Sequence, residues 1–241
     1  MTINLPPTTH HLPPTTHHAK LRLALTTYYS SLTTRAEGSF PFPLFKNKRV
    51  YVMLDYLSLK GNRMKKADAF KNACKNIKLL LFDCDGVLTD GRIVLGNDGI
   101  ELKFFSTFDG MGLKIWHMAG LAAGCITGRA SGALTKRAQE LKFDELHQNI
   151  ADKNETLDSI MKQRGLKPEE VAYIGDDIND LPVGTKVGLF FVPANHHEVI
   201  RPYADYILSR KGGFGAVREA IDIILTNKGL LEDLVKSFAD R

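Results

Sequence analysis

The chain has 241 residues, of which 44% are hydrophobic and 24% are charged, as in an ordinary globular protein. No apolar run approaches the ~18 residues of a membrane span, so we expect no membrane partner. The three cysteines form no CxxC pair, which favours a reducing, cytoplasmic location over a disulfide framework.

The N-terminal quarter differs from the rest in charge and composition. Residues 1–63 carry eight Lys and Arg against two acidic residues, whereas residues 64–241 carry 24 against 25. The basic balance belongs to the first quarter, and the remainder gives no electrostatic reason to expect a nucleic acid as partner. Because the quarter opens with a tandem LPPTTHH repeat (5–18) and holds six of the ten prolines, we predict that it is disordered.

Several interpretations of this quarter stay open. Its few acids and many hydroxyls also resemble an organelle transit peptide. Alternatively, translation begins at Met64, which would make 1–63 a mis-annotated extension and 64–241 the functional domain. The apolar segment 49–59 could form a strand or a helix. Paired histidines in the repeat are expected to bind a metal only adventitiously: His10, His11, His17 and His18.

From residue 77 onward, short apolar runs alternate with amphipathic helical segments. This alternation predicts an α/β fold, with a Rossmann-like parallel sheet covered by helices on both faces. A short basic helix from residue 64 is expected before the first strand. The predicted strands are 77–82, 122–126, 171–174, 187–192 and 204–208. The predicted helices are 111–119, 130–141, 154–164, 178–184 and 214–226. Alternating apolar residues around an Asn-Asp-Gly turn predict a β-hairpin at 92–105, outside the main sheet.

Acidic residues follow the first and third predicted strands. Asp83 and Asp85 come directly after the first strand, and Asp176 follows the third. Because the carboxyl ends of parallel strands meet at one edge, these carboxylates should lie close together and repel one another. A hard cation would offset that repulsion. We therefore expect Mg²⁺, bound by Asp83, Asp176 and the backbone carbonyl of Asp85.

The same edge should hold groups that bind a phosphate. Thr127 and Gly128 follow the second strand, where a hydroxyl and backbone amides can cradle an anion. Lys153 opens the next helix and adds a positive charge. With the phosphate neutralised, Asp83 can attack phosphorus and form an aspartyl-phosphate. Asp85 can protonate the leaving oxygen and then activate water.

The segments DCDGVLTDG (83–91), ITGR (126–129), Lys153 and GDDINDLP (175–182) resemble, in order and spacing, the four motifs of haloacid dehalogenase-like phosphatases. The resemblance implies a capless member with a hairpin flap, Mg²⁺ and a homotetramer. It also implies a small-molecule substrate, the 8-phosphate of an eight-carbon 2-keto-3-deoxy sugar acid in lipopolysaccharide precursor synthesis. The implied substrate contacts are Asp85, Ser106, Thr107, Phe108, Asp109, Gly110, Lys114, Arg129, Arg137 and Lys153.

Two departures from that family pattern leave the sugar acid open. Phe108 and Phe214 stand where members often have cationic or polar residues, so another sugar acid phosphate, such as a nononate 9-phosphate, is the alternative substrate. The glycine-rich segment 211–219 is expected to be flexible at its start. There, Arg218 or the backbone around Phe214 is expected to help close the active site of an adjacent subunit.

Other classes of function are weaker alternatives. A non-catalytic phosphate-binding domain on the same fold would be signalled by loss of the nucleophile, the acid or the lysine, and all three are present. A phosphomutase needs a cap domain, but only about 15 residues separate Asp90 from Ser106. Asp90 is interpreted as a cap at the start of the hairpin. Asp177 is interpreted as a helix cap, and Asp180 either as a supporting residue or as a metal ligand.

Overall fold

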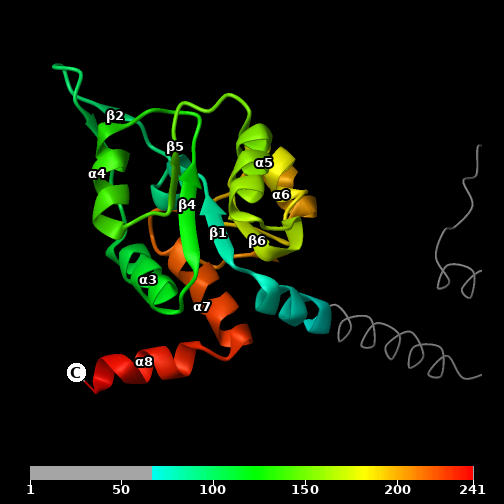
Figure 1. Cartoon of the computed structure of the whole chain (residues 1–241). Coiled ribbons are helices and arrows are strands. Elements are labelled where there is room, and N and C mark those ends of the chain that lie inside the picture. Colours follow the sequence, from blue (N-terminus) through cyan, green and yellow to red (C-terminus); the bar gives the residue numbers. More distant parts are fainter. Residues whose placement is uncertain (1–66, 241) are drawn as a thin grey trace, which may run out of the picture. The chain divides into compact units, whose positions relative to one another are not determined.

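Six parallel strands form the main sheet of the described residues, 67–240, in the order β5-β4-β1-β6-β7-β8 (Figure 1). This computed structural model does not describe residues 1–66 and 241, so the predictions on the repeat, its histidines, segment 49–59 and a start at Met64 lie outside it. The strands are β1 (Leu79–Phe82), β4 (Ala122–Ile126), β5 (Glu145–His147), β6 (Val171–Ile174), β7 (Leu189–Val192) and β8 (Tyr206–Ile207). The predicted α/β class with a parallel sheet is confirmed.

Helices cover both faces of the sheet, since successive side chains of a strand point to opposite faces. In β1, Leu80 and Phe82 belong to one apolar cluster, and Leu79 and Leu81 to the other. The first cluster includes residues of helix 67–76 and of α3 (Thr107–Met118), α4 (Gly132–Leu141) and α7 (Ala216–Lys228). The second includes residues of α5 (Lys153–Arg164) and α6 (Leu181–Gly184).

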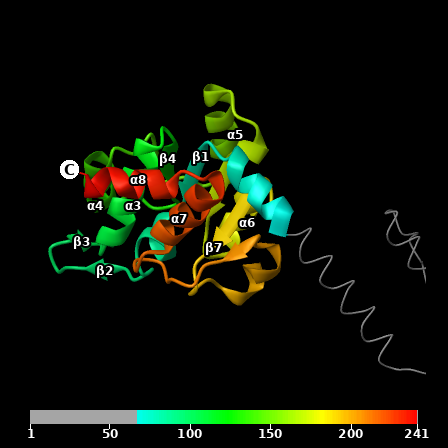
Figure 2. The same ribbon diagram turned by 90° about the horizontal axis from the view of Figure 1, so that it is seen from below.

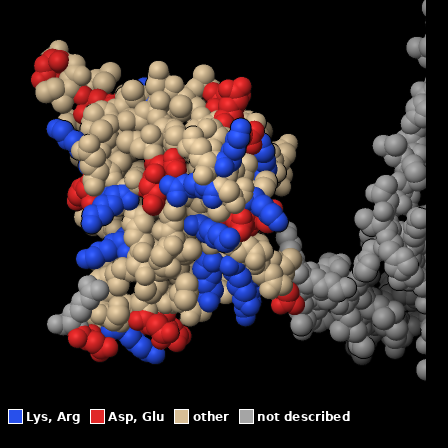
Figure 3. Space-filling model, viewed as in Figure 1, with Lys and Arg blue, Asp and Glu red and all other residues tan. Residues whose placement is uncertain are grey.

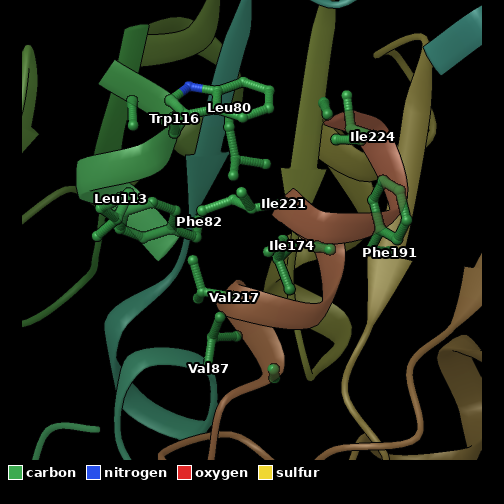
Figure 4. Packing of buried hydrophobic residues seen from close by; sticks show 14 of the residues in the cluster. Leu80, Phe82, Val87, Leu113, Trp116, Ile174, Phe191, Val217, Ile221 and Ile224 are labelled. Carbon is green, nitrogen blue, oxygen red and sulfur yellow. The ribbon is translucent and has the colours of Figure 1, made fainter. Parts of the chain in front are cut away.

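The first cluster forms the larger part of the core and fixes α3 and α7 on the sheet. In Figure 4, Phe82 and Ile174 of the strands face Leu113 of α3 and Ile221 of α7, all fully buried. The C-terminal helix α8 (Leu231–Ala239) packs on the same cluster through partly buried apolar residues. Burying such side chains stabilises the fold by roughly 1.5–3 kcal/mol each before entropy is counted. The core therefore holds β1 rigidly below the loop that follows it.

The observed boundaries of several strands and helices differ from the predicted ones. Strands 122–126 and 171–174 are as predicted, whereas the last strand shrinks to two residues of β8. Helix α3 begins at Thr107, four residues earlier than predicted, because the Ser106 hydroxyl caps it by accepting from the Phe108 amide. The predicted helix 178–184 divides into a short turn, η4 (Ile178–Asp180), and α6. β5 and α8 were not predicted.

The predicted hairpin is present as β2 (Val94–Leu95) and β3 (Glu101–Leu102), which pair antiparallel and project from the body in Figures 1 and 2. The Gly96 amide donates to the Ile100 carbonyl (2.8 Å) and closes the turn. The apolar side chains of the hairpin are exposed, with Leu95 at 66% and Phe104 at 64%. In the described chain, the segment between Asp90 and Ser106 is this hairpin and no cap domain, which confirms the capless prediction.

The surface carries both signs of charge. Lys and Arg side chains lie among Asp and Glu on the face seen in Figure 3. Within residues 67–240, no helix is long and apolar enough to cross a membrane. The three cysteines are free and buried.

Candidate active site

The sheet order brings the predicted site residues together. β1 lies between β4 and β6, so their carboxyl ends are neighbours. Asp83 follows β1 directly, Thr127 follows β4, and Asp176 lies two residues beyond β6. Lys153 is the first residue of α5 and is only 5% exposed. These groups therefore come from separate segments of sequence and meet at one edge of the sheet.

Lys153 links two carboxylates at the centre of the site. Its Nζ lies 3.1 Å from Oδ1 of Asp83 and 2.7 Å from Oδ1 of Asp180. Burial lowers the pKa of Lys153, but Asp180 and Asp83 outweigh it and hold the pKa above its ordinary value. The ammonium is therefore a fixed positive charge. A buried ammonium of this kind needs such partners, because an unpaired buried charge is strongly destabilising.

Asp83, the predicted nucleophile, is 6% exposed and is held by the backbone that follows it. Its Oδ1 accepts from the Cys84 amide at 2.7 Å. Burial, opposed by the charge of Lys153 and reinforced by that of Asp180, raises the pKa of Asp83 to about 6. Without a bound cation, the pocket therefore favours a protonated Asp83 more than water does.

Oxygen atoms of Asp83, Asp176 and Asp180 lie within 4.8 Å of one another, close enough to share one metal ion. Burial, together with the charges of Asp180 and Asp83, raises the pKa of Asp176 to about 8. No hydrogen bond or ion pair to the Asp176 carboxylate occurs within the described part of the chain. An all-oxygen donor set with mutual repulsion fits a hard divalent cation such as Mg²⁺.

Asp180 holds the loop of the site and has little capacity left for a metal. Its Oδ1 accepts from Lys153 and from the Tyr173 hydroxyl (2.6 Å), and its Oδ2 accepts from the amides of Asp176 (2.8 Å) and Asp177 (3.2 Å). The sequence left its role open between support and ligation. Four bonds to a fully buried carboxylate favour support. Asp177 caps η4, as expected, through its bond to the Ile178 amide.

Gly86 lets the loop after β1 close over the acidic cluster. Its φ of +95° lies in the region that favours glycine, and a Cβ there would lie 2.0 Å from Oδ2 of Asp176. The fourth position of the DxDG sequence thus needs glycine for two reasons: its backbone has a positive φ, and the Asp176 carboxylate leaves no room for a Cβ. The same turn, η2 (Cys84–Leu88), buries the Cys84 side chain in the first apolar cluster.

Asp85 is held by the hairpin. The Lys103 ammonium donates to Oδ1 of Asp85, and its side chain is only 2% exposed. Glu101, two residues earlier in the hairpin, pairs with Arg129 at 2.9 Å, and Nε of Arg129 lies 3.5 Å from Oδ2 of Asp85. Sequence reasoning missed Lys103 and Glu101. The signal was the alternation of the hairpin. Glu101 and Lys103 alternate with three exposed apolar residues, Ile100, Leu102 and Phe104.

The predicted phosphate cradle follows β4. Thr127 is 2% exposed, and its backbone joins β5 and the next loop through bonds to the His147 carbonyl (2.9 Å) and from the Ile150 amide (3.1 Å). The Arg129 amide lies 3.5 Å from the Thr127 hydroxyl oxygen. Gly128 between them is exposed. The structure thus places Thr127, Gly128 and Arg129 beside Asp83 and Asp85 along the sheet edge.

The start of α3 is tied to α4 and α7. Arg137 donates to the Ser106 carbonyl at 3.3 Å, and a Cβ on Gly110 would lie 2.6 Å from the Arg137 guanidinium. Asp109 is 2% exposed and accepts from the Arg218 amide at 2.8 Å, so it caps α7. Burial raises the pKa of Asp109 to about 6. Asp109 therefore contacts the start of α7, and the substrate contact that the resemblance implies for it stays a prediction.

Three other predicted residues lie at more exposed places on α3. Thr107 and Phe108 are exposed in its first turn, with Phe108 at 59%. The Arg210 guanidinium lies 5.6 Å from the Phe108 ring centre. The Lys114 ammonium lies over the ring of Phe238 in α8, 5.6 Å from its centre. The structure thus engages Lys114 with α8, and does not bring it to the acidic cluster.

The glycine-rich segment 211–219 packs on the loop that follows β1 in its own chain. A Cβ on Gly212 would lie 1.7 Å from the Gly86 carbonyl oxygen, and the Gly213 amide donates to the Val87 carbonyl at 3.0 Å. Phe214 is 58% exposed, and Arg218 pairs with Asp222 at 2.8 Å. In the described chain this segment therefore closes on the loop in cis. These contacts argue against a flexible start of the segment, whereas its expected role in the active site of an adjacent subunit stays a prediction.

Asp90 has the structural role that the sequence indicated. Its Oδ1 accepts from the Arg92 amide at 3.1 Å, and its Oδ2 accepts from the Arg92 side chain at 2.6 Å. These bonds hold the Arg92 side chain and lower the pKa of Asp90. Asp90 therefore caps the start of the hairpin and takes no part in the acidic cluster.

Comparison with known proteins defines the class first. A family model described as haloacid dehalogenase-like hydrolase matches residues 133–221. The 3-deoxy-D-manno-octulosonate 8-phosphate phosphatase of Escherichia coli (strain K12) is 40% identical over 167 residues, which are 69% of this chain and 88% of that protein. The enzyme of the same name from Yersinia pestis is 41% identical over 166 residues, 69% of this chain and 89% of that one. The chain belongs to the 3-deoxy-D-manno-octulosonate 8-phosphate phosphatase family of haloacid dehalogenase-like hydrolases.

Solved structures agree with that assignment. A probable YrbI family phosphatase from Pseudomonas syringae pv. phaseolica 1448a is 40% identical with a TM-score of 0.70, covering 71% of this chain and 98% of that one. The Moraxella catarrhalis 3-deoxy-D-manno-octulosonate 8-phosphate phosphatase, solved with magnesium, phosphate and the sugar acid, is 36% identical with a TM-score of 0.68, covering 70% and 97%. This protein is therefore a phosphoric monoester hydrolase, as the sequence motifs predicted.

Proposed function

We propose that this phosphatase hydrolyses 3-deoxy-D-manno-octulosonate 8-phosphate to the free sugar acid and phosphate, with Mg²⁺ as cofactor. The observation that carries the proposal is the cluster in which Lys153 joins Asp83 and Asp180 beside Asp176. The arrangement supports roles for Asp83 as nucleophile, for Lys153 as a fixed cation and for the carboxylate oxygens as metal ligands. The names of the relatives supply the substrate.

The chemistry proceeds in two half-reactions on this chain's own carboxylates. In the first, an Asp83 oxygen attacks phosphorus, the bond from phosphorus to the sugar oxygen breaks, and Asp85 gives that oxygen its proton. In the second, water attacks the phosphorus of the aspartyl-phosphate, Asp85 takes a proton from that water, and the bond to Asp83 breaks. Mg²⁺ held by Asp83 and Asp176 would offset their charge and favour the phosphate dianion.

Substrate selection rests on the groups around the acidic cluster. Thr127 and Lys153 suit the phosphate, and the Arg129 guanidinium suits the carboxylate of a sugar acid because it forms paired hydrogen bonds. The hairpin leaves the site without a cap domain, which admits a large sugar. Exposed Phe108 and Phe214 add apolar surface and no charge.

Phosphate release from a panel of sugar acid phosphates with Mg²⁺ tests the proposal. We expect the highest kcat/KM on the octulosonate 8-phosphate, and a lower value on the nononate 9-phosphate and on glycerol phosphate. A higher kcat/KM on the nononate 9-phosphate would make that compound the proposed substrate in place of the octulosonate 8-phosphate. Equal rates on glycerol phosphate and the octulosonate would refute the specificity.

A further inference from the structure

Lys103 is buried on an otherwise exposed hairpin. Its side chain is 2% exposed, whereas Leu102 and Phe104 beside it are 51% and 64% exposed. An ammonium is among the costliest groups to remove from water, and burial is tolerated only when a specific partner compensates. The partner is Asp85, whose Oδ1 accepts from Nζ, with Oε1 of Glu101 at 3.7 Å. The hairpin thus places a buried cation against the carboxylate of Asp85.

The two oxygens of Asp85 have different surroundings. Oδ1 accepts from Lys103 and lies 3.5 Å from the Thr89 hydroxyl. Oδ2 is buried and has no hydrogen-bond partner among residues 67–240, although Nε of Arg129 lies 3.5 Å away. A buried carboxylate oxygen without a partner is unusual and marks a functional position. Oδ1 of Asp85 is therefore held by Lys103 of the hairpin, whereas Oδ2 stays available to bind a proton.

Arg129, which lies beside Oδ2, limits how far the Asp85 carboxylate can rotate. Arg129 is itself bonded to Glu101 of β3 at 2.9 Å, and Lys103 directly follows β3, so the hairpin holds both cations. Without Lys103, the Asp85 carboxylate would lose its shortest contact within residues 67–240 and could rotate toward the Arg129 guanidinium. Both oxygens would then compete for one cation, and neither would be set for proton transfer.

From these contacts we infer that Lys103 is a positioning residue for the acid–base carboxylate: it holds Asp85 by one oxygen so that the other can exchange a proton with the leaving group and then with water. The inference rests on the two-step reaction proposed above. Because Asp85 serves both half-reactions, loss of Lys103 should slow each proton transfer and leave the attack by Asp83 intact.

Substrates with different leaving groups separate this role from a structural one. A sugar oxygen needs a proton to leave, whereas 4-nitrophenolate leaves without one. We therefore compare wild type with Lys103→Met on the octulosonate 8-phosphate and on 4-nitrophenyl phosphate, using rapid quench with Mg²⁺ present. A misplaced catalytic group costs about 10²-fold.

For Lys103→Met we expect kcat on the sugar phosphate to fall about 10²-fold, without a burst. On 4-nitrophenyl phosphate we expect a wild-type rate of the first turnover, seen as a burst of 4-nitrophenolate, followed by slow steady-state hydrolysis of the phospho-enzyme. Lys103→Arg, which retains a cation, should restore part of the steady-state rate. Lys78→Met is the matched control, because Lys78 also pairs with a carboxylate, Glu170 at 2.6 Å, but at the other end of β1.

Two results would overturn the inference. One is an unchanged kcat of Lys103→Met on both substrates. The other is an equal loss in the first turnover of both, which would make Lys103 a structural anchor of the flap. If Lys103→Met does not fold, Lys103→Gln, which keeps a neutral donor, undergoes the same comparison. A wild-type chain that hydrolyses neither substrate would instead refute the proposed function, and the role of Lys103 with it.

Discussion

Asp83 is the residue on which the covalent mechanism depends. Asp83→Asn keeps the size of the side chain but removes the nucleophile and one metal ligand, so we expect turnover to be abolished while the thermal midpoint stays near that of wild type. Asp85→Asn should lower kcat by roughly 10²–10⁴, as for loss of an acid–base group. Phosphate release and thermal melts measure both. Asp90→Asn is the control, since Asp90 bonds only to Arg92 among the described contacts, and wild-type turnover by Asp83→Asn would refute the aspartyl-phosphate.

The pKa values of two site carboxylates predict an unusual dependence of stability on pH. The pKa is raised from its ordinary value to about 6 for Asp83 and to about 8 for Asp176. The folded, metal-free chain thus binds these protons more tightly than the unfolded chain does. Their contribution to stability is complete below pH ~4 and is lost as pH rises through 6 and 8.

Melting in excess chelator at pH 5.5 and pH 8.5 tests that dependence. We expect the metal-free midpoint to fall by several degrees at the higher pH, since each kcal/mol corresponds to about 2–4 °C in a domain of this size. Mg²⁺ should raise the midpoint most at pH 8.5, because it binds the ionised carboxylates. Asp176→Asn should flatten the upper part of the profile. A metal-free midpoint that rises from pH 5.5 to 8.5 in wild type would contradict the raised pKa values.

Motif spacing made most of the site residues predictable, and contact geometry explains those it missed. Asp83, Lys153 and Asp176 each lie at the end of a strand or the start of a helix, so the sheet alone brings them together. Lys103 comes from a hairpin whose orientation over the sheet no local pattern specifies. Asp109 was assigned to the substrate, but its burial and its bond to the start of α7 depend on how two distant helices pack.

At the scale of elements, the turn after β1 is the most constrained. Gly86→Ala would place a Cβ 2.0 Å from Oδ2 of Asp176 and strain a φ of +95°. We expect loss of activity and a destabilisation of a few kcal/mol, consistent with strain at a special backbone position. Gly120→Ala is the matched control. Its φ is also positive, +74°, but no atom lies within 4 Å of the added Cβ, so only the backbone cost of about 1 kcal/mol is expected.

Denaturant unfolding and steady-state kinetics on both glycine variants give the comparison. Equal effects of Gly86→Ala and Gly120→Ala would mean that the backbone conformation alone matters and that the close approach to Asp176 does not. A larger effect at Gly86 would support a loop shaped around the acidic cluster.

Long buried elements were predictable from sequence, and short or half-exposed ones were not. The strands 122–126 and 171–174 are continuous apolar runs that only a buried strand explains. β5 has three partly buried residues, Glu145–His147, and its pairing with β4 gives it a strand conformation that its composition does not indicate. Helix α3 begins at Thr107, earlier than predicted, because Ser106 caps it. The apolar pattern used for the prediction begins only at residue 111 and so did not include this first turn.

At the scale of the molecule, the exposed hairpin predicts assembly. Ile93, Leu95, Ile100, Leu102 and Phe104 are each more than half exposed, and a lone two-stranded hairpin is marginal in water. We expect light scattering to give a mass near four chains, as the family resemblance implied. The double variant Ile93→Asp, Leu102→Asp should dissociate and lose activity, because Lys103 directly follows Leu102 in the hairpin. A variant that is monomeric yet fully active would separate the hairpin's apolar face from catalysis.

The N-terminal quarter yields a separate prediction. The strands of the main sheet and the acidic cluster all lie beyond residue 77, so a chain truncated to residues 64–241 should match the full chain in thermal midpoint and in kcat/KM. Parallel melts and kinetics on the two chains measure this. A midpoint lower by more than a few degrees would show that part of 1–63 packs on the domain.

The contact between Gly86 and Gly212 joins an early and a late part of the chain, and so has a consequence for protein synthesis. The loop after β1 emerges from the ribosome long before the segment that packs on it, in which a Cβ at Gly212 would lie 1.7 Å from the Gly86 carbonyl. A nascent chain that already contains all four sequence motifs still lacks the backbone that supports its nucleophile loop. We therefore expect the phosphatase to gain its activity only after Gly212 has been synthesised and can pack on this loop.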